Sequence, residues 1–179
     1  MNSKLLKIAV TGPESTGKSI LTEQLAHHYH TNFVPEYARE YIDKLQRPYN
    51  QEDILVIAQN QILNEHTLEK QANQIIFCDT ELIVTKIWSE VKYSSCDPWI
   101  LKTILENPYD LYLLCNIDIP WVDDPQREHP QMREYLFNLY FRELTDRKVS
   151  FAIVNGLGMR RLHNAVRIIE KYFGSRWNP

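Results

Sequence analysis

The stretch Gly12–Ser19, which reads GPESTGKS, fits the phosphate-binding pattern G-x-x-x-x-G-K-[ST] at every fixed position. The residues before it, 5–10, form a short apolar run rich in strand formers, and residues 20–26 after it carry apolar side chains at helical spacing. A strand, a glycine-containing loop and a helix in this order can bind the phosphates of a nucleotide. The sequence therefore predicts a phosphate-binding loop (P-loop) within an α/β fold.

The fixed positions of this loop have separate physical reasons. Gly12 and Gly17 allow the backbone to turn tightly and to approach phosphate oxygens, while successive N–H groups and the dipole of the following helix attract the anion. Lys18 is expected to place a positive charge on the β- and γ-phosphates of ATP, and the Ser19 hydroxyl to ligate Mg²⁺. We assign the following residues to the nucleotide: Gly12, Glu14, Ser15, Thr16, Gly17, Lys18 and Ser19.

Length and composition favour one domain with a small-molecule substrate. The 179 residues, 44% of them hydrophobic, can bury a full core, so we expect a single P-loop kinase domain over residues 1–179. The net charge is −3 and the basic residues are scattered, which argues against nucleic acid as a partner. Residues 1–10 are too short and too charged for a signal peptide, and no apolar run has the length of a membrane span. We expect a cytoplasmic protein whose three cysteines are reduced and structural.

Short apolar runs that alternate with helical patterns predict the architecture. Strands are expected at residues 8–10, 32–34, 75–78, 111–115 and 151–154. Helices are expected after the P-loop, from Asn50 to Leu68, from Glu81 to Val91, after Pro98, from Met132 to Leu144 and from Gly158 to Tyr172. Strands without polar alternation indicate a five-stranded parallel sheet with helices on both faces.

The polar, proline-containing segment after the fourth strand, about residues 118–133, is expected to be a mobile lid. Arginines on a closing segment, here Arg127 and Arg133, can neutralise charge on a phosphoryl group in transfer. The alternative is an exposed acidic loop in which these arginines are incidental.

Glu36 and Arg39 follow the second strand, where a parallel sheet places its ligands. The carboxylate could accept the proton of an attacking hydroxyl or bind a ribose, and the arginine could hold the transferring phosphoryl group. The competing interpretation is a solvated ion pair between the two on one helical turn.

Asp79 closes the apolar third strand, at the place where a Walker B aspartate supports Mg²⁺. The same residue could also act as N-cap of the helix that starts near Glu81, and the two roles are compatible.

Aromatic and histidine residues give weaker signals. Trp88 and Trp121 could stack on a flat heterocycle, although a single aromatic residue on a helix is more often part of the core. The histidines at positions 27, 28 and 30 lie near the end of the first helix without matching carboxylates or cysteines, so we do not expect a metal site there.

Four motifs together resemble the ribosylnicotinamide (nicotinamide riboside) kinase domain of the NadR family. That family's loop, G-x-E-S-[ST]-G-K-S, is matched within Gly12–Ser19, and its E-Y-[GA]-R-E-Y is matched by Glu36–Tyr41. Its D-T-[DE] is matched by Asp79–Glu81, and its lid motif P-W-V-x-D-x-x-R is matched by Pro120–Arg127. The similarity covers most of the chain. Small GTPases are excluded, because the motifs N-K-x-D and D-x-x-G are missing.

The resemblance implies transfer of the ATP γ-phosphoryl group to the 5′-hydroxyl of nicotinamide riboside, with Mg²⁺ as the metal, in NAD biosynthesis. The catalytic residues would be Lys18, Glu36, Arg39, Asp79 and Arg127, with Glu36 preferred over Asp79 as the base. The acceptor would be contacted by Tyr37, Glu40, Trp88, Trp121 and Asp124. Only the kinase step is expected here, without DNA binding or adenylyltransferase activity.

One departure concerns the acceptor. Family members often carry a tryptophan before E-Y-G-R-E-Y that suits stacking on nicotinamide, and this chain has Pro35 there. Two alternatives therefore stay open: a kinase for another nucleoside or nucleotide, and a regulatory module that binds ATP without catalysis.

Overall fold

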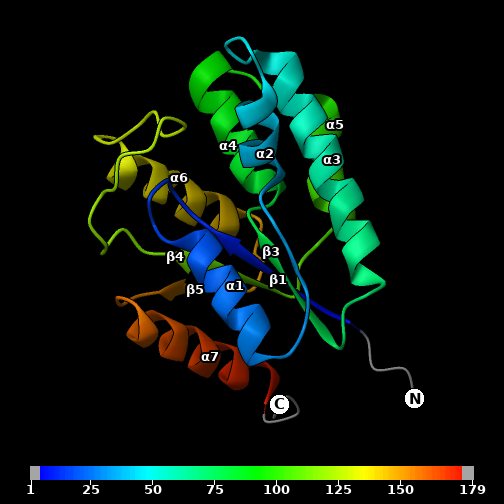
Figure 1. The fold of residues 1–179 in the computed structure, drawn as a ribbon, viewed down its shortest axis with the longest axis vertical. Helices are drawn as coiled ribbons and strands as arrows, with labels where there is room; N and C mark the ends of the chain where they lie inside the picture. Colours follow the sequence, from blue (N-terminus) through cyan, green and yellow to red (C-terminus); the bar gives the residue numbers. More distant parts are fainter. Residues whose placement is uncertain (1–4, 175–179) are drawn as a thin grey trace.

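A computed structural model describes residues 5–174, which form a five-stranded parallel sheet (Figure 1). The strands are β1 (Leu6–Thr11), β2 (Phe33–Val34), β3 (Ile75–Asp79), β4 (Leu111–Cys115) and β5 (Phe151–Val154). Their order across the sheet is β2-β3-β1-β4-β5, and every neighbouring pair is parallel. The predicted fold class is confirmed. The expectation about a signal peptide falls partly on residues 1–4, outside the described residues.

Seven helices connect and cover the strands within residues 5–174. They are α1 (Lys18–His28), α2 (Tyr37–Lys44), α3 (Gln51–Glu69), α4 (Leu82–Tyr93), α5 (Pro98–Glu106), α6 (Arg133–Asp146) and α7 (Met159–Phe173). One hydrophobic cluster joins α1 and α7 to one face of the sheet, and a second joins α3, α4, α5 and α6 to the other face (Figure 1). The helix α2 is not among the helices that the sequence predicts.

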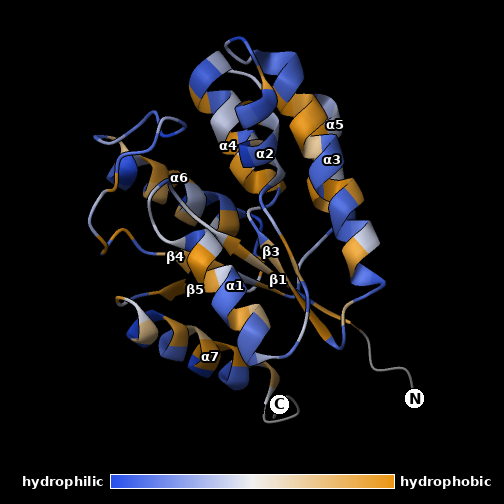
Figure 2. Cartoon of the chain, in the orientation of Figure 1, coloured by the Kyte–Doolittle hydropathy of each residue, from blue (hydrophilic) through white to orange (hydrophobic). Residues whose placement is uncertain are grey.

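The strands β3 and β4 are buried on both faces, as their continuous apolar sequences predict, whereas the edge strand β5 is mostly half-buried. All residues of β3 and β4 are buried, and Figure 2 shows the strands as the most hydrophobic part of the ribbon. Successive side chains of a strand point to opposite faces of the sheet. In β3, Ile76 and Cys78 pack toward α3 and α4, while Ile75 and Phe77 pack toward α1.

The first residues of α3 and α4 show how local sequence determines where a helix begins. Asn50 and Asp53 form a reciprocal capping box at the start of α3, as predicted from their spacing. The expectation that Asp79 could cap α4 is wrong, because the side chain of Glu81 caps this helix by accepting a hydrogen bond from the Ile83 N–H. The side chain of Asp79 therefore takes no part in capping α4.

Within residues 5–174, no helix has both the length and the apolar character needed to cross a bilayer.

Candidate functional site

The P-loop takes the expected shape, for a partly different reason. Gly12 has φ of +129°, and a Cβ there would lie 3.0 Å from the carbonyl oxygen of Cys115 in β4. The neighbouring strand therefore leaves no room for a side chain at position 12. Position 17 favours glycine for another reason, because its backbone at the N-cap of α1 is left-handed, with φ of +73°. Ser15 also has a positive φ, 54°.

Carbonyl groups of the loop accept hydrogen bonds from side chains of the loop itself and from Arg133. The Pro13 carbonyl accepts hydrogen bonds from the Thr16 hydroxyl (2.8 Å) and from Lys18 Nζ (2.9 Å). Arg133 donates to the Ser15 carbonyl at 3.1 Å and to the Ile119 carbonyl at 2.9 Å. From the sequence, Arg133 is expected to neutralise charge on a phosphoryl group. In the structure its guanidinium group instead binds two backbone carbonyl groups.

Asp79 lies at the end of β3, beside Val10 at the end of β1. Its side chain is buried, and its Oδ1 has no hydrogen-bond partner among the described residues. Burial, followed by the negative charge of Glu36, raises the pKa of Asp79 to about 6, while a hydrogen bond with Ser19 and the charges of Lys18 and Arg39 act in the opposite direction. An unpartnered carboxylate oxygen close to Ser19 fits the oxygen ligands that Mg²⁺ prefers.

Glu36 and Arg39 come from the start of α2, and they do not pair with each other. Glu36 occupies the N-cap position but its side chain makes no capping hydrogen bond, so the carboxylate stays available. Arg39 instead donates to Asp124 of the lid at 2.9 Å, which raises the pKa of the guanidinium. The alternative interpretation of a local Glu36–Arg39 ion pair is replaced by a contact between α2 and the lid.

The lid is fastened to the P-loop through backbone and side chains. Glu14 accepts hydrogen bonds from the backbone N–H groups of Glu128 and His129, both at 3.1 Å. The Ser15 hydroxyl accepts from the Val122 N–H at 2.9 Å, and Arg127 donates to the Val122 carbonyl and lies 3.5 Å from Ser15 Oγ. The variable positions of the loop motif therefore hold the segment that covers it.

One cavity of about 420 Å³ joins the P-loop, α2, α4, α6 and the lid. Predicted site residues that line it are Gly12, Glu14, Ser15, Thr16, Gly17, Lys18, Ser19, Glu36, Arg39, Trp88 and Arg127. Predicted site residues that are not among its lining are Tyr37, Glu40, Asp79, Trp121 and Asp124.

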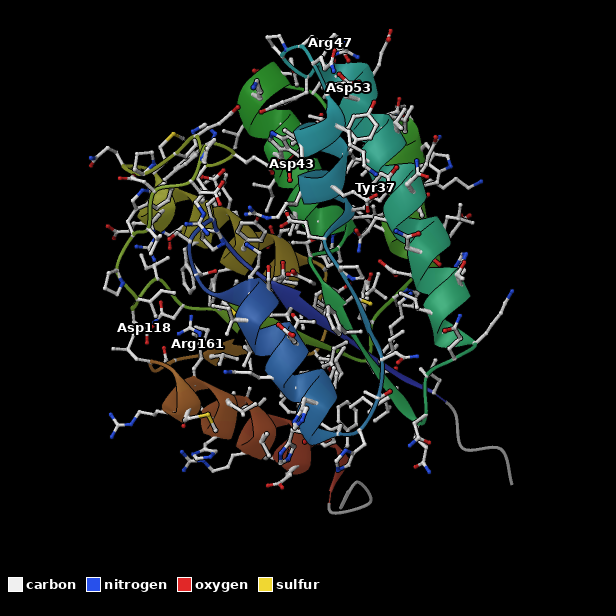
Figure 3. All side chains as sticks on the ribbon, in the orientation of Figure 1. Tyr37, Asp43, Arg47, Asp53, Asp118 and Arg161 are labelled. Atoms are coloured by element: carbon white, nitrogen blue, oxygen red, sulfur yellow. The ribbon has the colours of Figure 1, made fainter. Side chains whose placement is uncertain are left out.

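The residues outside the lining have other neighbours. Tyr37, on the α2 surface in Figure 3, packs its ring 6.1 Å from that of Tyr41, and Glu40 pairs with Lys44 on the same helix. Trp121 lies in the lid and donates to Asp123 at 2.7 Å. Asp124 pairs with Arg39 and lies 4.0 Å from Arg127, so it touches the site through these two arginines.

The wall of the cavity formed by α4 and the lid contains a cluster that the motifs do not reveal, made of Tyr49, Trp88, Lys92 and Glu128. Trp88 Nε1 donates to the Tyr49 hydroxyl at 2.9 Å, and this hydroxyl donates to Glu128 at 2.9 Å. Lys92 pairs with Glu128 at 3.1 Å and lies 3.6 Å from the centre of the Tyr49 ring. The spacing of residues 84, 87, 88 and 91 along α4, all of which line the cavity, is the sequence signal for this wall.

Comparison with known proteins supports the resemblance read from the motifs. The trifunctional NAD biosynthesis/regulator protein NadR of Salmonella typhimurium is 28% identical over an alignment of 178 positions, which covers 94% of this chain and 43% of NadR. NadR of Escherichia coli K12 is 28% identical over an alignment of 155 positions, which covers 82% of this chain and 37% of NadR. The chain spans less than half the length of these relatives.

Solved structures agree on the fold. A crystal structure of NadR in complex with NR matches with a TM-score of 0.83 at 25% identity over 98% of this chain and 51% of that chain. Thymidylate kinase from Ehrlichia chaffeensis matches with a TM-score of 0.64 at 11% identity over 94% of this chain and 98% of that one, which concerns the fold alone.

A protein-family match covers most of this chain. Residues 7–161 match the family AAA_28, described as an AAA domain. This match includes the P-loop, α2, β3 and the lid, so it spans every segment of the site. The chain belongs to the AAA_28 family of AAA domains.

Proposed function

We propose that this chain is an ATP-dependent kinase that phosphorylates the 5′-hydroxyl of a nucleoside, with nicotinamide riboside as the preferred acceptor. The observation that carries the proposal is the single cavity in which the P-loop faces Glu36, Arg39 and the Tyr49–Trp88 wall. A cavity that joins a phosphate site to an acidic group and an aromatic wall suits two substrates that react with each other.

The residues divide the reaction between them. The acceptor hydroxyl oxygen would form a bond to the γ-phosphorus, the bond from that phosphorus to the β–γ bridging oxygen would break, and ADP would leave. Glu36 would orient the hydroxyl and take its proton, and Lys18 would hold the phosphates. Arg39 and Arg127, which lie beside Asp124 and line the same cavity as the P-loop, would turn to the phosphoryl group as its charge redistributes.

Ser19 and Asp79 would hold Mg²⁺ together with the ATP phosphates. The metal, when bound, supplies neutralisation of the phosphate charge. The protein's own contribution is a buried carboxylate with an unpartnered oxygen among the described residues.

Nicotinamide riboside is preferred because of the similarity to NadR, one crystal structure of which is a complex with NR. The aromatic pair Tyr49 and Trp88, whose ring centres are 4.8 Å apart, supplies apolar surface on the acceptor side even though Pro35 cannot stack. A kinase for another nucleoside or nucleotide remains the second candidate, since the same fold occurs in thymidylate kinase.

A panel of acceptors tests the proposal. Purified protein with MgATP is given nicotinamide riboside, other nucleosides and nucleoside monophosphates, and ADP formation is followed together with the phosphorylated product. We expect the highest kcat/KM with nicotinamide riboside. Turnover of another acceptor alone would reassign the substrate, and ATP binding without turnover of any acceptor would favour a regulatory module.

The proposal includes the domain organisation. Residues 1–179 would act as one P-loop kinase domain with the lid at about residues 118–133.

A further inference from the structure

Arg161, in the first turn of α7, is a buried charged residue that the reaction described above does not use. Its side chain is 5% exposed and lies beside Asp118 (Figure 3). Burial of a guanidinium group is costly unless its donors are bound, so the partners of such a group show what it stabilises.

These partners come from separate loops at the carboxyl ends of the strands. Nη1 donates to Asp118 Oδ1 at 2.8 Å and to the Gly156 carbonyl at 2.7 Å. Nη2 donates to the Thr16 carbonyl at 3.0 Å and to the Asn116 carbonyl at 2.7 Å. One planar group thereby connects the P-loop to the loop after β4 and to the loop after β5.

The bond to Thr16 matters because of how a P-loop binds phosphate. Its N–H groups point toward the anion, so its carbonyl groups point outward and need donors elsewhere. Thr16 is only 1% exposed, so water cannot easily serve its carbonyl, and Arg161 supplies the donor. The same guanidinium places a permanent positive charge behind the phosphate site.

The loops after β4 and β5 are also bonded to each other around Arg161. Asp118 Oδ2 accepts a hydrogen bond from the Gly156 N–H at 2.6 Å, and Asn116 Nδ2 donates to Asn155 Oδ1 at 2.6 Å. Such loops border the ligand site of a parallel sheet. Arg161 thus lies where a change in one loop is transmitted to the P-loop.

We propose that Arg161 is a positioning residue of the donor-nucleotide site, which fixes the Thr16 carbonyl and holds the P-loop in register with the loops after β4 and β5. It touches neither substrate. Its effect on nucleotide affinity is indirect, through the geometry of the loop that binds the phosphates. The inference rests on the proposed function only through its nucleotide site.

The test compares Arg161→Lys with Arg160→Lys, the same substitution at the exposed neighbouring position. Lysine keeps the charge but cannot span four acceptors, so we expect R161K to bind ADP about tenfold more weakly in isothermal titration calorimetry. R160K should bind as the wild type does. ADP affinity within twofold of the wild type in R161K would overturn the proposal.

A second set of measurements separates positioning from plain structural support. In R161K the KM for ATP should rise while the KM for the acceptor stays constant, at a temperature well below the melting temperature of the variant. Equal rises in both would indicate a general loosening of the fold and contradict the proposal. If R161K does not fold, Asp118→Asn weakens the link from Arg161 to the loop after β4 and leaves the Thr16 bond in place. ADP should then bind several-fold more weakly, and an ADP affinity within twofold of the wild type would contradict the proposed coupling between the loops.

Calorimetry with ADP needs no acceptor, so it also separates this inference from the proposed function. Wild-type protein that binds no nucleotide would refute the kinase assignment. Wild type and R161K with equal affinity would refute only the role of Arg161.

Discussion

The two parts of the cavity that we propose for the two substrates, the P-loop for the donor and the wall of α2, α4 and the lid for the acceptor, are built in different ways. The donor end is backbone: P-loop peptide groups set by Gly12 and Gly17, between strands that are buried on both faces. The acceptor end is made of side chains from α2, α4 and the lid, and α2 has no fully buried residue. The donor end is therefore fixed by the core, whereas the acceptor end is held by exposed polar contacts that can open at small cost in free energy.

The contact between Arg39 and Asp124 illustrates the difference. It is an ion pair between a 46% exposed arginine and a 20% exposed aspartate, of a kind that contributes little to stability. At the donor end, the equivalent contact is the buried bond from Arg161 to the P-loop. A lid that must release product is expected to use contacts of the first kind.

Loss of the donor-end charge should have the largest effect. Lys18→Ala removes the cation that we propose binds the ATP phosphates, and we expect kcat/KM to fall by about 10³-fold or more. The measurement is steady-state kinetics with ATP and the best acceptor. Lys102→Ala, at an exposed position of α5, is the control and should be as active as the wild type; equal activity in K18A would break the assignment of the donor end.

Glu36→Gln tests the group at which the two ends meet. We expect kcat to fall by about 10²-fold, since the hydroxyl loses its proton acceptor. Melting temperatures of wild type and variant should be similar, because the Glu36 side chain makes no capping bond. A variant with full activity would transfer the role of base to Asp79.

The same variant has a pH signature. The pKa of Asp79 is raised to about 6 by burial and then by the Glu36 charge, so kcat/KM should fall with acidity as Asp79 is protonated near pH 6. In E36Q this limb should move to lower pH, because the second cause is removed. A limb that stays in place would show that the two carboxyl groups do not interact.

The donor end could be predicted from sequence because its function lies in consecutive residues. Gly12–Ser19 predicts the loop itself. The reason for Gly12 requires β4 to be in place, and the donor to the Thr16 carbonyl, Arg161, requires the folded sheet. The position of Asp79 at the end of β3 could be predicted because this acidic residue closes an apolar run, while its role in the site stays a prediction.

The acceptor end could be predicted only in part, because its contacts join residues far apart in sequence. Tyr49 and Glu128, 79 positions apart, share a hydrogen bond that no local pattern encodes. Arg39 likewise pairs with Asp124 rather than with its neighbour Glu36. Arg161 was missed for the same reason, since its meaning depends on three loops that only the folded sheet brings together.

Glu81, at the N-cap of α4, should make the stability of the folded protein depend on pH. Burial raises the pKa of Glu81 to about 7, with Thr11 and the Ile83 N–H as hydrogen-bond donors to the carboxylate. Because the folded pKa lies above the usual value, the folded state binds the proton more tightly, so stability is full below about pH 4.5 and falls as pH rises to about 7. The loss from this group is about 3 kcal/mol.

Urea unfolding from pH 5 to pH 8 measures this loss in comparison with Glu81→Gln. The amide can accept from the Ile83 N–H and donate to the Thr11 hydroxyl, so the variant should keep the contacts without the pH dependence. Glu23→Gln, at an exposed position of α1, should follow the wild type. Parallel pH curves for wild type and E81Q would refute the assignment.

The smallest effect is expected at the acceptor end, from Tyr49→Phe. The variant keeps the ring but removes the hydroxyl that accepts from Trp88 and donates to Glu128, so the lid loses one of its two contacts with the acceptor wall. We expect the KM of the acceptor to rise several-fold, up to about tenfold, while the KM of ATP stays constant. Steady-state kinetics with each substrate varied in turn measures both.

Tyr135→Phe, at an exposed position of α6, is the matched control and should change neither KM. A hydrogen bond on the acceptor side should affect the KM of the acceptor, because the P-loop is fixed by the sheet and by the side chains that donate hydrogen bonds to its carbonyl groups. A rise in the KM of ATP as large as that of the acceptor would show that the lid transmits strain to the P-loop through Glu14, and the two ends would then form one mechanical unit.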